Sequence, residues 1–166
     1  MSELITYYLE MHSIEALQAK PALHDMVIQE AQVKNFRLNR FLYQLVGEPW
    51  QWTDKLSWSD DAWQRHVERP QVRTWMAMVQ GSVAGYFELE RDDDGNTEIL
   101  YFGLAPDFVG KGYGGYLLTE AIRQAWQVEN TQRVWVHTCN LDHPSALQNY
   151  LARGFKQYDT EVETLP

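Results

Sequence analysis

The sequence contains a single cysteine, Cys139, and few basic residues. One cysteine excludes an internal disulfide and a metal site made of cysteines alone, which agrees with a reducing compartment. Lysine and arginine together number 14, against 23 aspartates and glutamates, so the formal net charge is −9. Such a field repels nucleic acid and anionic membranes, and it favours cationic substrates such as amines. We therefore expect no nucleic-acid partner.

The sequence also lacks long apolar runs and metal-ligand motifs. No stretch approaches the roughly 18 apolar residues that a membrane-spanning helix needs. The first residues, MSELITYYLE, carry acids where a secretory signal has a basic flank. The 5 histidines show no ligand spacing such as a pair at i and i+4. We expect a cytoplasmic protein with no membrane partner and no metal.

The chain is large enough for one domain, which we place at residues 1–166, and its 45% hydrophobic content supports a real core. Gly81 and Asp94-Gly95 separate three short strand-like segments, which predicts an antiparallel meander. The expected class is α+β: a twisted mixed sheet of about six to seven strands, with the meander followed by strand, helix, strand, helix, strand, and helices on both faces. The predicted strands are 4–11, 24–31, 74–80, 82–90, 97–105, 133–139 and 155–163, and the predicted helices are 35–46, 59–69, 117–128 and 144–153.

A glycine-rich stretch, LAPDFVGKGYGGYLL at 104–118, precedes the third helix. Gly110, Gly112 and Gly115 fit the spelling G-x-G-x-x-G, and a cradle of backbone N–H groups at a helix N-terminus binds phosphate. The dinucleotide-binding interpretation fails on context, because four residues separate the strand from the glycines and that strand ends an antiparallel meander. A Walker A loop is excluded, since Gly-Lys-Ser/Thr does not occur.

The same stretch resembles the acyl-CoA pyrophosphate loop of the GNAT superfamily of N-acetyltransferases, written Arg/Gln-x-x-Gly-x-Gly/Ala. HPSALQNYLARGF at 143–155 resembles the next motif of that superfamily, in which a tyrosine, here Tyr150, lies four residues before Gly154-Phe155. The two motifs and their strands cover roughly the last 70 residues. The N-terminal half, with the segment NRFLYQLVGEPWQW, resembles that of a bacterial subgroup of the superfamily.

The resemblance implies acetyl-CoA as cosubstrate and a small-molecule or peptide amine as acceptor, in a monomer or homodimer. Val109 stands where the superfamily has Arg or Gln, so one side-chain contact to the cofactor is missing. Counting back from the tyrosine, either Asn140 or His143 takes the position of a cofactor-contacting residue. The other implied coenzyme A contacts are Phe102, Gly103, Leu104, Val109, Gly110, Lys111, Gly112, Tyr113, Gly114 and Gly115.

Direct transfer of an acetyl group to an amine needs a base for the amine and a proton donor for the departing thiolate. Tyr150 is the candidate acid, and the alternative is a tyrosine that packs in the core on the apolar face of its helix. Glu98 is the candidate base, as the only ionisable side chain in TEILYFGLA apart from a tyrosine. Strict alternation places it on the face of Phe102, where burial raises a carboxyl pKa; a solvated charge after the turn is the alternative. Glu88 and Glu90 are further candidates.

Other residues invite chemistry but are more simply structural. Cys139 as an acyl carrier and His137 as a base are less favoured than a buried cysteine and a core histidine. Asp54 is a candidate partner for a substrate ammonium. Trp50, Trp52 and Trp58 form either an aromatic wall for the acceptor or part of the core. The leading hypothesis is an acetyl-CoA-dependent N-acetyltransferase, and the alternative is a non-catalytic module that binds or senses acyl-CoA.

Overall fold

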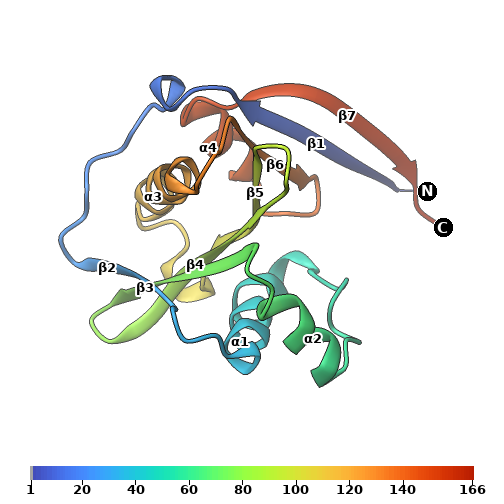
Figure 1. Cartoon of the computed structure of the whole chain (residues 1–166). Coiled ribbons are helices and arrows are strands. Elements are labelled where there is room, and N and C mark those ends of the chain that lie inside the picture. The colour runs from blue at the N-terminus through green and yellow to red at the C-terminus, as the bar shows by residue number, and fades with distance from the viewer. Residues whose placement is uncertain (1) are drawn as a thin grey trace.

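The computed structural model describes residues 2–166 of the chain. The order of helices and strands in this range follows the predicted order, and Figure 1 shows their arrangement. The strands are β1 (Glu3–Met11), β2 (Met26–Glu30), β3 (Val72–Val79), β4 (Ser82–Arg91), β5 (Asn96–Leu104), β6 (Arg133–Cys139) and β7 (Lys156–Thr164). The α-helices are α1 (Phe36–Gly47), α2 (Asp60–Val67), α3 (Gly114–Gln127) and α4 (Ala146–Ala152), and the 3-10 turns are η1 (Ile14–Ala16), η2 (Glu48–Trp50) and η3 (Pro106–Phe108).

Local sequence signals set most of these boundaries. The Ser59 side chain accepts a hydrogen bond from the Ala62 N–H and starts α2, as the sequence predicts. The fourth helix was expected to begin at Pro144, and this is wrong by two residues. The Ala146 N–H bonds to the His143 carbonyl three residues back, so a tight turn precedes the first residue of α4.

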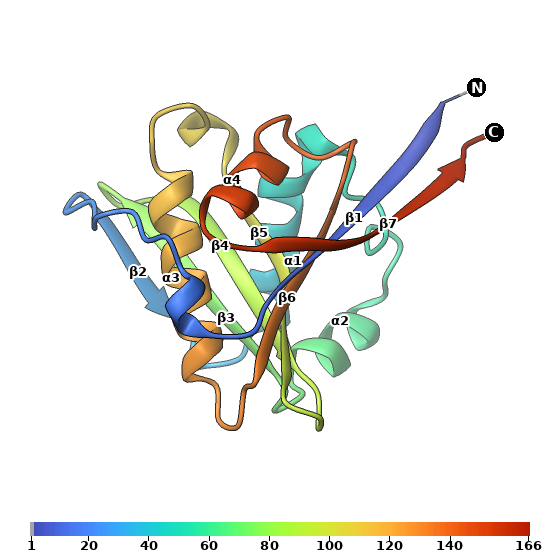
Figure 2. The same ribbon diagram turned by 90° about the horizontal axis from the view of Figure 1, so that it is seen from above.

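The described part of the chain forms a sheet of seven strands in the order β2-β3-β4-β5-β6-β1-β7. Strands β2 to β5 are antiparallel neighbours, which confirms the meander, and β6 joins β5 in parallel. Strand β1 lies between β6 and β7 and is antiparallel to both. Figure 2 shows β1 and β7 side by side as an arm that carries both chain ends away from the helices. The mixed α+β class and the predicted number of strands are confirmed.

A β-bulge in β5 changes which side chains share a face. The pairing of β4 with β5 shifts register between Glu88 and Leu89, so strict alternation fails near Leu100. Ile99 and Phe102 both pack into the core under α3. The expectation that Glu98 shares a face with Phe102 is therefore wrong, because the bulge turns the end of the strand by one residue.

The helices cover both faces of the sheet, as predicted. Helix α3 packs on β4, β5 and β6, and α4 lies beside it; together they enclose the larger core. Helices α1 and α2 pack on the opposite face, against β3, β4 and β5, around a cluster of aromatic rings. Figure 1 shows the two helix layers on either side of the sheet.

The parallel pairing of β5 with β6 is short and leaves an opening. Asn96, Thr97 and Glu98 pair with β6, at Arg133, Val134 and Trp135. Beyond Glu98 the two strands separate, so within residues 2–166 the backbone of β5 from residue 99 to 104 has no strand on its β6 side. Unpaired backbone groups at a gap between strands are free to bind a ligand. The gap places the candidate site.

Candidate functional site

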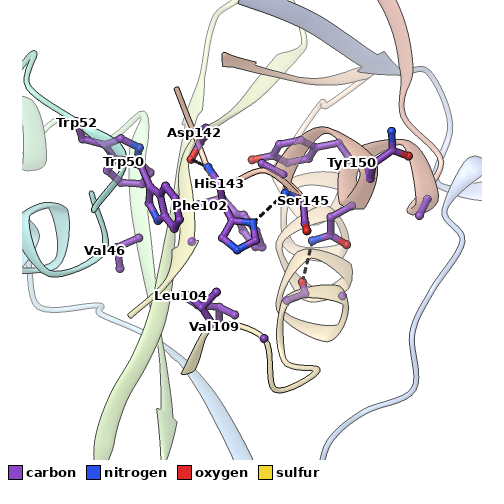
Figure 3. Close-up of a pocket in the computed structure, with 18 residues that line it drawn as sticks. Val46, Trp50, Trp52, Phe102, Leu104, Val109, Asp142, His143, Ser145 and Tyr150 are labelled. Carbon is purple, nitrogen blue, oxygen red and sulfur yellow. Dashed lines mark hydrogen bonds between the residues drawn. The ribbon is translucent and has the colours of Figure 1, made fainter. Parts of the chain in front are cut away.

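A cleft of about 410 Å³ opens beside the second half of β5 (Figure 3). One wall is the end of β5, the second is the glycine loop with the start of α3, and the third is α4 with the turn before it. Trp50 and Trp52 reach in from the segment after α1. The Trp50 ring meets the His143 ring edge to face, with 4.9 Å between centroids. The cleft is therefore built from segments far apart in the sequence.

The glycine loop has a backbone shape that side chains disfavour. Gly110 and Gly112 have φ of 79° and 89°, in the left-handed region, and a Cβ atom at either position would find nothing within 4 Å. The loop therefore presents open backbone next to the N-terminus of the 14-residue helix α3, whose first N–H groups have no partner within the helix. This arrangement fits the pyrophosphate of an acyl-CoA.

Most of the predicted coenzyme A contacts line this cleft. They are Phe102, Gly103, Leu104, Val109, Gly110, Gly114, Gly115 and His143. Gly112 lines a neighbouring pocket instead. Between the two alternatives for the last contact, the cleft contains His143, whose Nδ1 accepts a hydrogen bond from the Ser145 N–H at 2.9 Å.

Besides Gly112, three further predicted contacts lie outside the cleft. The Asn140 side chain accepts from the Ile5 N–H and donates to the Glu3 carbonyl, both at 2.9 Å, so it fixes β1 instead of facing the cleft. The Tyr113 hydroxyl donates to Asp25 at 2.7 Å. Lys111 is exposed on the outside of the loop. In each case a position near the glycines or the strand end does not determine the direction of the side chain.

A second cavity of about 290 Å³ adjoins the cleft. The two cavities share the residues Trp50, Trp52, Phe102, Asp142 and Tyr150. The second cavity extends between β5 and β6 towards β1 and has aromatic and acidic walls, among them Tyr43, Tyr101 and Asp54. Lys55 Nζ donates to the Tyr101 hydroxyl and lies over its ring, which fixes that wall. The site thus has two compartments joined at a small group of shared residues.

Tyr150 lies at the junction of the compartments. It comes from α4, is only 4% exposed, and packs between Phe102 and Phe155, with ring centroids 6.0 and 5.9 Å away. Burial, and secondly the charge of Asp142, raise the pKa of Tyr150 above its ordinary value. The phenol therefore stays protonated at neutral pH. Figure 3 shows its ring directed from α4 towards the cleft.

The candidate base Glu98 lies behind the wall of the second cavity, and His137 lies on that wall. Glu98 Oε2 and His137 Nδ1 are 3.0 Å apart. Within residues 2–166 this oxygen accepts no hydrogen bond, so its contact with His137 is an electrostatic one. The contact with Glu98 raises the pKa of His137, against the opposing effect of burial. The sequence undervalued His137, because the parallel pairing of Glu98 with Trp135, two residues before His137, joins strands that are far apart in the sequence.

The other candidate bases are occupied elsewhere. Glu88 is 1% exposed under α1 and α2, where it contacts His66 Nε2 at 2.7 Å and accepts from Asn39 at 2.9 Å. Glu90 pairs with Arg69 at 3.1 Å. Neither glutamate lines either compartment. Their interactions are structural.

The remaining candidates divide between core and site. Trp58 packs on Trp63 in the core under α2, while the other two tryptophans of the segment line both compartments. Cys139 lines the second cavity and is half-buried. Sequence reasoning missed Asn149, which lines the cleft and donates to the Gly114 carbonyl at 3.2 Å. Its position one residue before Tyr150 on the same helix was the available signal.

The family model described as Acetyltransferase (GNAT) family matches residues 39–155. The match spans more than half of the chain, so the protein belongs to the GNAT acetyltransferase family. No curated protein matches the chain.

Solved structures share the fold at low identity. A GCN5-related N-acetyltransferase from Sphaerobacter thermophilus has a TM-score of 0.74 at 12% identity, covering 98% of this chain and 51% of its own. One from Kribbella flavida has a TM-score of 0.68 at 16% identity, covering 95% and 56%. An IAA acetyltransferase from Bacillus cereus has a TM-score of 0.61 at 24% identity, covering 81% and 79%. This chain therefore spans little more than half the length of the first two structures.

Membrane-spanning helices and metal-binding clusters are both absent from residues 2–166. No helix in this range has the length and apolar character needed to cross a bilayer. No group of three or more His, Cys, Asp or Glu side chains in the same range is placed to hold a metal ion.

Proposed function

We propose that the protein transfers an acetyl group from acetyl-CoA to a primary amine, directly, with both substrates bound at once. The observation that supports this most strongly is the junction of two compartments at Tyr150, beside the gap between β5 and β6. A donor in the cleft and an acceptor in the second cavity would meet there. Bound acetyl-CoA supplies the thioester that the amine attacks.

The residues of the chain have separate tasks in this proposal. The glycine loop and the first turn of α3 hold the pyrophosphate, and the unpaired backbone of β5 near Phe102 to Leu104 donates to the carbonyl oxygen of the thioester, where negative charge develops. Trp50 and His143 close the outer side of the cleft. These contacts fix the donor and exclude water.

Proton transfer involves His137 and Tyr150. His137, on the wall of the acceptor cavity, removes a proton from the amine while Glu98 stabilises the imidazolium that forms. The neutral amine then attacks, the new C–N bond forms as the C–S bond breaks, the second amine proton passes to solvent, and the thiolate leaves. A phenol with a raised pKa is a weaker acid than a thiol, whose ordinary pKa is about 8.5, so Tyr150 acts mainly by donating a hydrogen bond to the thiolate.

The lining of the acceptor cavity suits a small cationic amine. Asp54 and Asp142 line it together with aromatic rings, and the net charge of −9 favours approach of cations. A volume of about 290 Å³ suits a small molecule or the end of a side chain.

The test is release of free thiol from acetyl-CoA in the presence of a panel of primary amines, with mass spectrometry of the products. We expect release that depends on the amine and gives an acetylated amine. Thermal stabilisation by coenzyme A without turnover of any amine would favour the alternative, a module that binds or senses acyl-CoA. Absence of both stabilisation and turnover would refute both.

A further inference from the structure

A third pocket lies on the far side of the glycine loop and carries two cations. It has a volume of about 440 Å³ and shares Gly114, Gly115 and Asn149 with the donor cleft, so it adjoins the cleft at the first turn of α3. Lys20, Arg153 and Gly112 also line it. None of the motifs discussed above includes either cation as a ligand contact.

Arg153 carries a buried guanidinium that has no anionic partner among residues 2–166. The residue is 8% exposed, and its Nε has no hydrogen-bond partner among residues 2–166. No ion pair in the same range includes it. Burying an arginine without a partner is unfavourable, and such groups are normally paired. An anionic ligand in the pocket would complete it.

Lys20 is held next to the same point of the helix. The backbone N–H of Lys20 donates to the Thr119 hydroxyl at 3.0 Å, and that hydroxyl donates to the Gly115 carbonyl at 2.8 Å. A Cβ atom on Gly115 would lie 2.7 Å from Arg153 Nη1 and 2.8 Å from Lys20 Cγ. The two side chains therefore flank Gly115, where the positive end of the α3 dipole also lies.

The main chain fixes this arrangement. The Gln18 N–H donates to the Arg153 carbonyl at 2.9 Å, and η1 packs against the turn at Gly154. The segment from η1 to Lys20 thus joins the end of α4 to the start of α3. The main chain at Lys20 and Arg153 and the buried Arg153 side chain are positioned before any ligand arrives, which lowers the entropic cost of binding.

We propose that Lys20 and Arg153 form a phosphate-binding site for the acyl donor and supply the positive charge that Val109 does not. This inference rests on the proposed function, because it assumes a coenzyme A donor. Two parts of coenzyme A have the required chemistry: the pyrophosphate and the 3′-phosphate of the adenosine. Planar, forked donors such as the Arg153 guanidinium suit either.

The experiment measures Kd by calorimetry for coenzyme A and for dephospho-coenzyme A, which lacks the 3′-phosphate. The proteins are the wild type, Lys20→Met, Arg153→Met and the control Lys156→Met, which removes the same charge from exposed β7 outside the pocket. Each of the first two substitutions is expected to weaken coenzyme A binding about tenfold or more, as loss of a charge-assisted hydrogen bond does. The control stays within about twofold.

The two ligands identify the phosphate. If Arg153→Met weakens coenzyme A but leaves dephospho-coenzyme A unchanged, the site takes the 3′-phosphate; an equal loss for both assigns it to the pyrophosphate. Wild-type-like affinity in Lys20→Met and Arg153→Met overturns the inference and leaves the proposed function standing. A wild type that binds no coenzyme A overturns both. Lys20 is exposed, so its variant gives a folded protein if Arg153→Met does not.

Discussion

Replacing Tyr150 by phenylalanine separates catalysis from binding. The change removes one hydroxyl and keeps the ring that packs against Phe102 and Phe155. That hydroxyl makes no hydrogen bond within residues 2–166, so the substitution changes the free energy of unfolding by less than about 1 kcal/mol. The donor cleft also keeps its shape, so the Kd for coenzyme A stays within about twofold.

The rate of the chemical step responds differently. A positioned proton or hydrogen-bond donor contributes roughly 10²-fold or more, so kcat falls about 100-fold, which is about 2.7 kcal/mol in the activation free energy. The assay is thiol release at saturating acetyl-CoA and amine, with calorimetry and thermal unfolding on the same samples. Tyr158→Phe on exposed β7 is the matched control and keeps wild-type kcat. A kcat of Tyr150→Phe within about threefold of wild type, with unchanged stability, would refute the role of the hydroxyl.

Three further changes test other parts of the site and fold. Glu98 raises the pKa of His137, and only the neutral imidazole accepts a proton, so activity rises as the pH climbs through that pKa. Glu98→Gln lowers the pKa of His137 and moves the acid limb of the plot of kcat/KM against pH to lower pH. An acid limb that does not move contradicts the pairing of Glu98 with His137. Gly154→Ala places a Cβ atom 2.0 Å from the Ala16 carbonyl oxygen, at a residue whose φ is 109°. Calorimetric unfolding is expected to show a free energy of unfolding lower by about 2–4 kcal/mol. A decrease below about 1 kcal/mol would mean that the turn adapts to the side chain. Asp54→Asn raises KM for a cationic amine about 3-fold to 10-fold in steady-state assays with kcat unchanged, and an unaltered KM removes Asp54 from the acceptor site.

The sequence predicted the elements that depend on local chemistry. Ser59 begins a helix because its side chain satisfies a backbone donor, and Gly154 ends one because it adopts a left-handed φ of 109°. The glycine loop next to α3 was also predictable, since positive φ at Gly110 and Gly112 needs glycine. Such features are determined by a few neighbouring residues, so one sequence is enough to find them.

The site depended on contacts that local patterns do not contain. The bulge in β5 turned Phe102 away from the face of Glu98, and the partner of Glu98, His137, comes from another strand. The partner strands of β1, β6 and β7, lie far from it in the sequence. Lys20 and Arg153, which line one pocket, are likewise far apart in the sequence. Arg153 lies within the motif NYLARGF, yet nothing in the motif shows that its side chain lacks an anionic partner. These properties appear only when distant segments are brought together.

The position of β1 between β6 and β7 has a consequence for how the chain folds. The Ile5 N–H bonds to the side chain of Asn140, 135 residues away, so this contact carries a large loop-closure cost. During synthesis β1 emerges long before either of its neighbours exists, whereas the β3 to β5 meander can pair as soon as it is made. β1 must then be inserted between two strands made last. We expect the meander to form early, and closure of the sheet around β1 to be the slow step, during which an apolar strand stays open to aggregation.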